Sequence, residues 1–290
     1  MNIGIVGNGY VGKATRILEC DEIPAYVYDI DPEKCSPVGL QLTELLPCSF
    51  IFVCVPTPMR KDGSCDTSIV SSVIEELKST NRSPDRIIVR STVPIGFCRS
   101  HGVNFMPEFL TELNWENDFK DAEKRIVAID SPNIERRRKL QDEIKELFRL
   151  AFKHGKINKA ILDNTFVFCS TGEAETAKLA RNSFLATKVS FFNEVASLCE
   201  KKKINYKEVA KLTGMDERIG EGHTLVPGHD GKRGFGGTCF PKDTKSMVYQ
   251  MGNSIVVKAV VERNENVDRP ERDWELNEGR AVSFVPKFKG

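Results

Sequence analysis

The first half of the chain alternates short apolar runs with stretches of helical periodicity. Strands are expected where the apolar runs are continuous, and helices where apolar residues recur every three or four positions. The predicted strands are Asn2–Val6, Ala25–Asp29, Ser49–Val55, Arg86–Arg90, Val103–Met106, Arg125–Ile129 and Thr165–Cys169. The helices predicted between them are Tyr10–Glu19, Thr67–Leu77 and Asn133–Phe152. Strands that alternate with helices indicate an α/β fold with a doubly wound parallel sheet.

The first predicted strand runs into a glycine-rich turn, GNGYVG, which opens a helix. Such a turn brings a pyrophosphate to a helix N-terminus, where backbone N–H groups favour an anion. The second strand ends at Asp29, whose carboxylate is placed to bond a ribose 2′-hydroxyl and would repel a 2′-phosphate. We therefore predict a Rossmann-type site for NAD, and its residues are Gly7, Gly9, Tyr10, Val11, Gly12 and Asp29.

Two further strand ends carry unusual residues. Pro56–Pro58 follows the third strand, and Thr92–Pro94 follows the fourth. Ligands of doubly wound sheets bind at the carboxyl ends of the strands. We therefore expect Pro56, Thr57 and Thr92 to lie beside the cofactor, in the same crevice as the glycine turn.

The second half of the chain is helical in pattern. A long helix is expected over Glu173–Lys202, because its apolar residues recur at three- and four-residue spacing. A shorter helix is expected over Tyr206–Leu212, and one or two more over Pro241–Asn266, interrupted by Gly252. The pattern predicts a Rossmann-type domain over residues 1–171, a helical central domain over 172–268 and an irregular tail over 269–290.

Composition narrows the class of protein. Of the 290 residues, 40% are hydrophobic and 29% charged, and the net charge of +1 gives no steering toward nucleic acid or an anionic membrane. Nine cysteines without a CxxC pair argue against a disulfide framework or a zinc site. The N-terminus lacks a signal-peptide pattern, and no apolar run approaches membrane-spanning length. We expect a cytoplasmic protein that binds no metal, nucleic acid or membrane.

The clearest chemistry lies in GFGGTCFPKD, where Cys239 stands between a glycine-rich loop and Pro-Lys-Asp. Pro241 suits the first turn of a helix, so Cys239 is expected just ahead of a helix N-terminus. The positive end of that helix and the ammonium of Lys242 favour a thiolate, which is the nucleophilic form. Free cysteines are usually buried and inert, but this flanking pattern favours a nucleophile.

Together these motifs resemble the UDP-glucose/GDP-mannose dehydrogenase family, almost from end to end. The resemblance rests on the order and spacing of GNGYVG, VPTP, STVPIG, PEFL, the helix with Lys178, Asn182, Phe192, Asn193 and Glu194, RIG and GKRGFGGTCFPKD. The last motif is most similar to the UDP-glucose branch. The resemblance implies oxidation of a nucleotide sugar, UDP-glucose to UDP-glucuronate, with two NAD per sugar.

The resemblance also implies a role for each matched side chain. Cys239 would capture the aldehyde as a thiohemiacetal, which loses a second hydride to give a thioester that water hydrolyses. Lys178 and Asn182 would stabilise the oxyanion. Asp243, with Glu108 or Glu112, would handle protons and water.

Further implied contacts concern the cofactor and the substrate. Thr92 would position water near the nicotinamide, and Lys242 would lie by the cofactor. Arg218 would reach substrate across the interface of a homodimer formed through the helical domain. The implied substrate residues are Phe109, Leu110, Lys178, Asn182, Arg218, Phe235 and Gly236.

Two features depart from the family pattern. The connection Asp31–Ser49 is shorter than usual. The chain also ends soon after Cys239, without room for the third domain that grips the nucleotide of the substrate. We therefore expect activity that is weak, that needs a separate chain to supply this domain, or that has moved to another substrate.

Two other functions stay open. A hydroxyacid dehydrogenase of the 6-phosphogluconate type would share the two-domain plan and a Lys-Asn helix, but it needs no nucleophilic cysteine. A non-catalytic NAD-binding or dimerisation module would explain the absent domain, but not the intact Cys239, Lys178 and Asp243. The number of NADH released per sugar separates the three.

Overall fold

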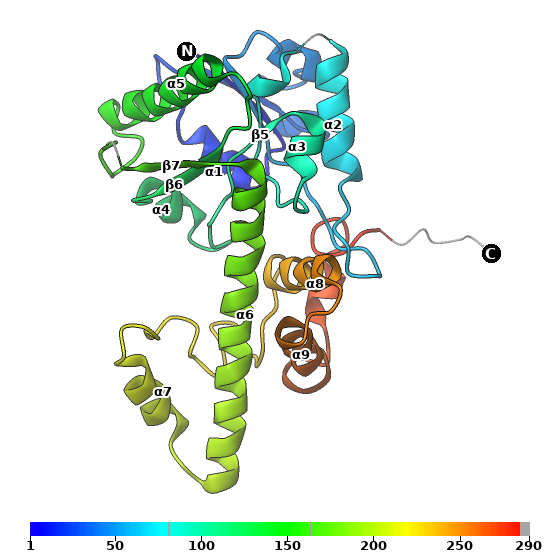
Figure 1. The fold of residues 1–290 in the computed structure, drawn as a ribbon, viewed down its shortest axis with the longest axis vertical. Coiled ribbons are helices and arrows are strands. Elements are labelled where there is room, and N and C mark those ends of the chain that lie inside the picture. The colour runs from blue at the N-terminus through cyan, green and yellow to red at the C-terminus, as the bar shows by residue number, and fades with distance from the viewer. Residues whose placement is uncertain (81, 163, 285–290) are drawn as a thin grey trace, which may run out of the picture. The chain divides into compact units, whose positions relative to one another are not determined.

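The computed structural model describes residues 1–80, 82–162 and 164–284, and the chain divides into two compact units (Figure 1). Unit 1 comprises Met1–Thr57 and Thr67–Lys178, and unit 2 comprises Pro58–Asp66 and Leu179–Gly290. Helix α6, Thr171–Lys202, contributes residues to both units. Every helix in the described ranges is too short or too polar to span a bilayer.

Among the described residues, unit 1 is built on a seven-stranded sheet with the order β2-β1-β3-β4-β5-β6-β7. The doubly wound α/β sheet that the sequence predicts is confirmed. The strands are β1 Ile3–Val6, β2 Ala25–Tyr28, β3 Phe50–Val53, β4 Ile87–Val89, β5 Asn104–Phe105, β6 Arg125–Ala128 and β7 Phe166–Cys169.

The sequence predicts a parallel sheet, and this prediction is wrong for one pair of neighbouring strands. Phe105 of β5 pairs antiparallel with Ala128 of β6, whereas the other neighbouring strands pair in parallel. Between these strands the described residues 106–124 form one helix, the six-residue α4, Trp115–Lys120. The chain thus re-enters the sheet from the edge at which it left, and this connection supplies Glu108 to the carboxyl edge of β5.

Helices cover both faces of the sheet. On one face lie α1 Tyr10–Arg16, α4 and α5 Ile134–Lys153, and on the other lie α2 Ser68–Ser79 and α3 Phe97–His101. The helix predicted over residues 133–152 carries an apolar stripe, in which Leu140, Ile144, Leu147, Phe148 and Ala151 are buried, whereas Ile134 at its start is 55% exposed. Burial of a large apolar side chain contributes about 1.5–3 kcal/mol, so this stripe is a main anchor of the sheet.

Several details differ from the sequence pattern. Helix α1 ends at Arg16 and not at Glu19, because the next N–H groups bond three residues back, as from Ile17 to Ala14. The connection from β2 to β3 contains two 3-10 helices, η1 Pro32–Lys34 and η2 Leu42–Leu45. Leu42 and Leu45 of η2 are buried, so the short connection still covers its part of the sheet.

Unit 2 is helical, as predicted. The part of α6 within it is joined by α7 Tyr206–Gly214, α8 Phe240–Met251 and α9 Val256–Arg263. Two helices therefore flank Gly252, which caps α8 with φ 66°. A small core forms around Ala186, Phe235 and Val260.

The chain after α9 folds back within unit 2. A π-helix, η4 Asn264–Asp268, is followed by a 3-10 helix, η5 Asp273–Leu276, which buries Trp274. Beyond it the backbone pairs with the Pro58–Asp66 segment, since Met59 N donates to Ala281 O at 2.9 Å and Ser283 N donates to Met59 O at 2.8 Å. Residues 285–290 of the predicted tail lie outside the described residues.

Candidate active site

The glycine turn between β1 and α1 is closely packed. Gly7 has φ 95°, in the left-handed region that favours glycine. A Cβ at Gly7 would lie 2.7 Å from the carbonyl oxygen of Cys54, just after β3, and a Cβ at Gly12 would lie 1.9 Å from the carbonyl oxygen of Gly7. A Cβ at Gly9 would meet no described atom within 4 Å. Two glycines therefore close the turn, and the third keeps the start of α1 open.

Asp29 faces this turn from the end of β2. Its Oδ2 accepts a hydrogen bond from Asn8 N at 2.7 Å, and its Oδ1 accepts one from Asp31 N at 3.0 Å. A carboxylate oxygen has a second lone pair, so Asp29 can still accept a ribose hydroxyl. Tyr10 and Val11 begin α1 and are half-buried. The turn lies at the β2-β1-β3 switch point, and these residues fit a dinucleotide.

The ends of β3 and β4 meet beside the turn, as the sequence predicts. Thr57 Oγ1 donates to the carbonyl oxygen of Thr92 at 2.6 Å, and Ser91 Oγ donates to that of Val55 at 2.6 Å. Thr57 and Thr92 are buried, whereas Pro56 is exposed. These contacts bring the predicted cofactor residues of unit 1 to one edge of the sheet.

Lys178 is buried in unit 1 against the segment Pro107–Leu110, the PEFL motif. Its Nζ donates to Glu108 O at 2.7 Å and to Glu108 Oε1 at 2.8 Å, and it lies 5.5 Å from the ring centroid of Phe109. The side chains of Lys178 and Glu108 are 3% and 4% exposed. Leu110 N donates to Glu108 Oε2 at 2.8 Å. An ammonium has three donors, so these two bonds leave one for a substrate oxygen.

The two acids predicted as alternatives have different surroundings. Glu108 is buried and bonded to Lys178. Glu112 is exposed and belongs to the turn that follows. The structure therefore brings Glu108 to the lysine, and Glu108 is the better candidate for proton transfer.

In unit 2, Cys239 is the N-cap residue of α8, with Pro241 in the first turn, as predicted. Asp243 is buried one turn on and binds two neighbours: Asn182 Nδ2 donates to its Oδ2 at 2.6 Å, and Lys242 pairs with its Oδ1. Burial alone would lower the pKa of Lys242, but the charges of Asp243, Cys239 and Cys65 raise it. Lys242 is thus held as a cation close to the Cys239 thiol.

The loop before Cys239 is fixed by amide side chains. Asn264 Oδ1 accepts from Phe235 N at 2.8 Å, and Asn264 Nδ2 donates to Phe235 O at 2.9 Å. Asn193 Oδ1 accepts from Gly234 N at 3.2 Å. The sequence does not predict this role for Asn264, because the residue belongs to no recognised motif and lies 29 residues from Phe235 in the chain.

Arg218 is set apart from these groups. Its side chain is 89% exposed, and it bonds Asp216 through Nε at 3.0 Å and Nη2 at 2.6 Å. The structure of one chain does not bring it to the other predicted residues of unit 2.

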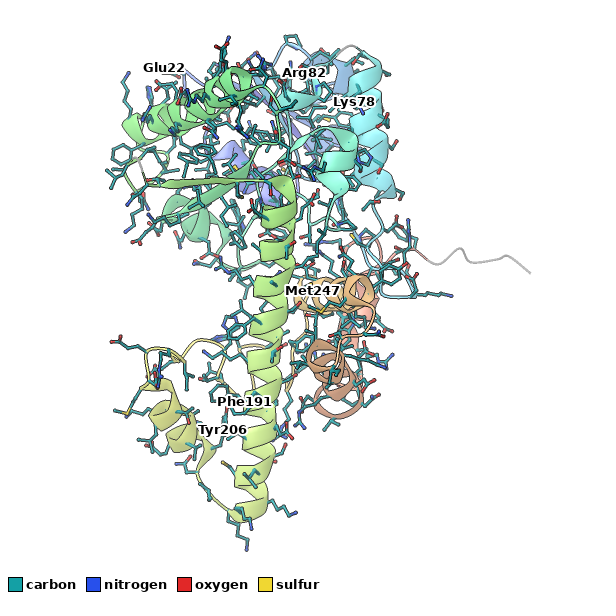
Figure 2. All side chains as sticks on the ribbon, in the orientation of Figure 1. Glu22, Lys78, Arg82, Phe191, Tyr206 and Met247 are labelled. Carbon is teal, nitrogen blue, oxygen red and sulfur yellow. The ribbon has the colours of Figure 1, made fainter. Side chains whose placement is uncertain are left out.

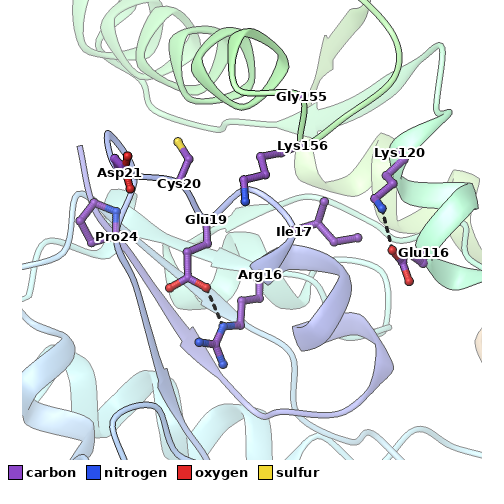
Figure 3. Close-up of a pocket in the computed structure, with 10 residues that line it drawn as sticks. All are labelled: Arg16, Ile17, Glu19, Cys20, Asp21, Pro24, Glu116, Lys120, Gly155 and Lys156. Atoms are coloured by element: carbon purple, nitrogen blue, oxygen red, sulfur yellow. Dashed lines mark hydrogen bonds and ion pairs between the residues drawn. The ribbon is translucent and has the colours of Figure 1, made fainter.

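A cavity of about 670 Å³ opens at the opposite edge of the sheet, near the start of β2 (Figure 3). It is lined by Arg16, Ile17, Glu19, Cys20, Asp21, Pro24, Glu116, Lys120, Gly155 and Lys156. Two of its cations are already paired, Arg16 with Glu19 and Lys120 with Glu116. The cavity contains none of the predicted residues and lies away from the carboxyl ends of the strands. Within the described ranges, no group of three His, Cys, Asp or Glu side chains is placed to hold a metal ion.

The fold and the glycine turn define an NAD-binding α/β protein. Residues 40–150 match the NAD binding domain of the UDP-glucose/GDP-mannose dehydrogenase family, and residues 172–269 match its central domain. The chain is 31% identical over 304 residues to UDP-glucose 6-dehydrogenase of Campylobacter jejuni, which covers 91% of this chain and 72% of that one. The chain therefore belongs to the UDP-glucose/GDP-mannose dehydrogenase family.

Solved structures share its fold. The UDP-glucose dehydrogenase of Pyrobaculum islandicum superposes with a TM-score of 0.73 at 24% identity, over 91% of this chain and 68% of that one. The 3-hydroxyisobutyrate dehydrogenase of Mycobacterium tuberculosis does so with a TM-score of 0.62 at 15% identity, over 94% and 95% of the two chains. At these identities the likeness concerns the fold alone.

The chain spans less than two thirds of the length of several relatives. It covers 46% of a relative from Bacillus subtilis, and 64% and 66% of the UDP-glucose 6-dehydrogenases of Rickettsia felis and Rickettsia conorii. Identity to the Rickettsia conorii protein is 30% over 308 residues.

Proposed function

We propose that this chain oxidises the primary alcohol of a nucleotide sugar to a carboxylate, with UDP-glucose as substrate and two NAD per sugar. The observation that carries the proposal is Cys239 at the N-terminus of α8, beside the Lys242 cation and the Asn182–Asp243 pair. A thiol in this setting is an activated nucleophile. Oxidation of an aldehyde without its release favours such a covalent tether.

The cofactor would be held by unit 1. Gly7, Gly9 and Gly12 would hold its pyrophosphate at the start of α1, and Asp29 its adenosine ribose. Bound there, NAD accepts a hydride in each oxidation. Thr57 and Thr92 would lie beside it, because their strand ends adjoin the turn.

The first oxidation removes a hydride and a proton from the alcohol and gives an aldehyde. The Lys178 ammonium would stabilise the developing alkoxide, and Asn182 would assist it. Burial strengthens this contribution, since Lys178 and Glu108 are shielded from water. Glu108, which already bonds Lys178, would accept the proton.

In the second oxidation the Cys239 thiolate would add to the aldehyde carbon and form a thiohemiacetal. Loss of a second hydride would leave a thioester. Water, positioned by Thr92 and deprotonated by Asp243 or Glu108, would attack the thioester carbon and release the carboxylate and the thiol. The alcohol thus loses four electrons, as two NADH.

The same proposal makes the protein a homodimer through its helical unit. Phe184, Phe191 and Leu198 recur every seven residues along α6 and are 67%, 57% and 55% exposed. Figure 2 labels Phe191 on α6 and Tyr206 at the start of α7. Such a stripe is typical of a helix-packing seam. The exposed Arg218 would then contact substrate held by the partner subunit.

We also propose a role for each part of the chain and a cytoplasmic location. Residues 1–171 would bind NAD, residues 172–268 would carry the nucleophile and the dimer contact, and 269–290 would form the tail. All nine cysteines lie in the described residues and outside disulfides, which suits the reducing cytoplasm.

The test counts NADH released per UDP-glucose. We expect two, and a loss of turnover on the order of 10³–10⁶-fold in Cys239→Ser. Cys20→Ser, a half-buried thiol at the other edge of the unit 1 sheet, is the matched control and should keep full activity. One NADH from a hydroxyacid, unaffected by Cys239→Ser, would identify a hydroxyacid dehydrogenase instead. NAD binding without turnover, even with an added nucleotide-binding domain, would identify a non-catalytic module.

A further inference from the structure

Arg269 follows the π-helix η4 and is buried in unit 2, with its side chain 5% exposed. Its Nε and Nη2 donate to the two oxygens of Asp273, each at 2.7 Å, and its Nη1 pairs with Asp230 Oδ2 at 2.7 Å. The hydrogen bonds from Arg269 hold the pKa of Asp273 well below its usual range. Two carboxylates therefore fix the plane of the guanidinium, as they fix arginine forks generally.

This guanidinium lies against the backbone of Gly236. A Cβ at Gly236 would lie 2.5 Å from Arg269 Cζ, 2.7 Å from Nη2 and 2.8 Å from Nε. These separations are far below van der Waals contact, so the arginine leaves no room for a side chain. The φ of Gly236 lies outside the left-handed region, so its backbone conformation does not itself require glycine.

The next glycine is required for a different reason. Gly237 has φ 72°, and a Cβ there would meet no described atom within 4 Å. A side chain at Gly237 would thus be strained by the backbone alone. A substitution at Gly236 therefore tests the contact with Arg269, whereas a substitution at Gly237 tests the backbone conformation of the loop.

The same arginine contacts both ends of residues 230–236, the segment that precedes the nucleophile. Asp230 pairs with its guanidinium, and Gly236, three residues before Cys239, packs against it. Lys232 adds a bond to Asp273 at 2.7 Å. The segment after α9 thereby fixes the position of residues 230–236, which lead into α8.

We propose that Arg269 is a positioning residue for Cys239, acting through the packing of its guanidinium on Gly236. The inference rests on the proposed function for its catalytic meaning. Arg269 touches neither substrate nor cofactor in this account. It holds the loop so that the thiol keeps its place at the N-cap of α8.

A double-mutant cycle tests the contact. Gly236→Ala and Arg269→Ala should each lower kcat about 10²-fold, the cost of moving a reacting group by about 1 Å, with the KM for NAD unchanged. The double variant should be no worse than Arg269→Ala, because removal of the guanidinium makes room for the new methyl group. Gly237→Ala should instead lower kcat by the same factor in the wild-type and the Arg269→Ala backgrounds, because its strain does not depend on the guanidinium.

Two variants serve as controls. Arg272→Ala removes a nearby, more exposed arginine that pairs with Glu265 and Glu275, and it should keep wild-type kcat. Arg269→Lys keeps the charge without the fork, and it should not rescue kcat. If Arg269→Ala does not fold, the cycle is run with Asp273→Asn, which releases the guanidinium from its bidentate partner.

A second readout separates this inference from the proposed function. The rate at which iodoacetamide alkylates Cys239, followed by peptide mass spectrometry, requires no turnover. The same coupling between Gly236 and Arg269 in that rate would support the positioning role, even in a protein that oxidises no nucleotide sugar. Additive effects in both readouts, or wild-type kcat and alkylation in Arg269→Ala, would overturn it.

Discussion

At the scale of single residues, the site contains buried charges that are paired within the protein. Lys178 is paired with Glu108, and Lys242 with Asp243. Desolvation of two charges offsets much of their attraction, so buried ion pairs are weak sources of stability. Their presence at the predicted positions therefore favours a chemical role over a structural one.

The Lys178–Glu108 pair gives the first prediction. Lys178→Met alone should destabilise the protein by about 3–5 kcal/mol, because it leaves a buried carboxylate without its partner. Lys178→Met with Glu108→Gln should recover most of that loss in urea unfolding, while kcat stays at least about 10²–10³-fold low, because the oxyanion partner and the proposed proton acceptor are both gone. A stable double variant with wild-type kcat would remove Lys178 from the mechanism.

Thiol reactivity gives a second prediction at this scale. Burial raises the pKa of Cys48 and of Cys54 to about 11. Their thiolate fraction at pH 8 is therefore small, and their alkylation should rise about tenfold per pH unit until pH 11. Cys239 should be labelled first at pH 8, and Lys242→Met should slow it. Lys245→Met, which removes a lysine paired with Glu265, is the control and should leave that rate unchanged.

At the scale of elements, the ends of strands and helices place the candidate residues. These ends could be predicted because their signals are local: the glycine turn, the acid after β2 and the proline after Cys239. The apolar periodicity of α5 is a local signal as well. The antiparallel β5–β6 pairing could not be predicted, nor could the contacts of Asn264 and Arg269 with the loop before Cys239. They depend on contacts between distant segments, which leave no periodicity in the sequence.

Helix α5 carries the prediction for this scale. Asp85 accepts from Arg136 Nε at 2.5 Å and Nη2 at 2.9 Å, and these bonds lower its pKa. Because the folded pKa lies below the unfolded value of 3.8, the stabilisation is present above pH 3.8 and is lost as the pH falls further. Asp85→Asn should cost about 1 kcal/mol at pH 7 and less at pH 2, which lies below the unfolded pKa.

Urea unfolding at the two pH values measures this difference. Asp142→Asn, which changes an exposed carboxylate of α5, the helix that carries Arg136, should cost little at either pH. An equal cost of Asp85→Asn at pH 7 and pH 2 would contradict the assigned pairing.

At the scale of the whole molecule, each unit brings one part of the proposed reaction. Unit 1 carries the dinucleotide turn and the Lys178–Glu108 pair, and unit 2 carries the cysteine loop with Asn182 and Asp243. The family match covers both parts. The exposed stripe on α6 extends the account to a second copy of the chain.

The oligomeric state tests that extension. We expect a dimer in analytical ultracentrifugation, and a monomer after Phe184→Glu with Phe191→Glu, because charges would enter an apolar seam. Phe152→Glu changes an exposed phenylalanine of α5 and should leave the dimer intact. A wild-type monomer that is fully active would exclude the assembly and the role of Arg218 across it.

The covalent step at Cys239 is tested most directly by mass spectrometry of a quenched reaction. Asp243→Asn should slow hydrolysis and let the thioester accumulate. After incubation with NAD and UDP-glucose, the account predicts a Cys239 peptide heavier by the acyl group of the uronate, absent without NAD and absent from Cys239→Ser. Turnover that releases two NADH per sugar while Cys239 stays unmodified, or that persists in Cys239→Ser, would contradict it.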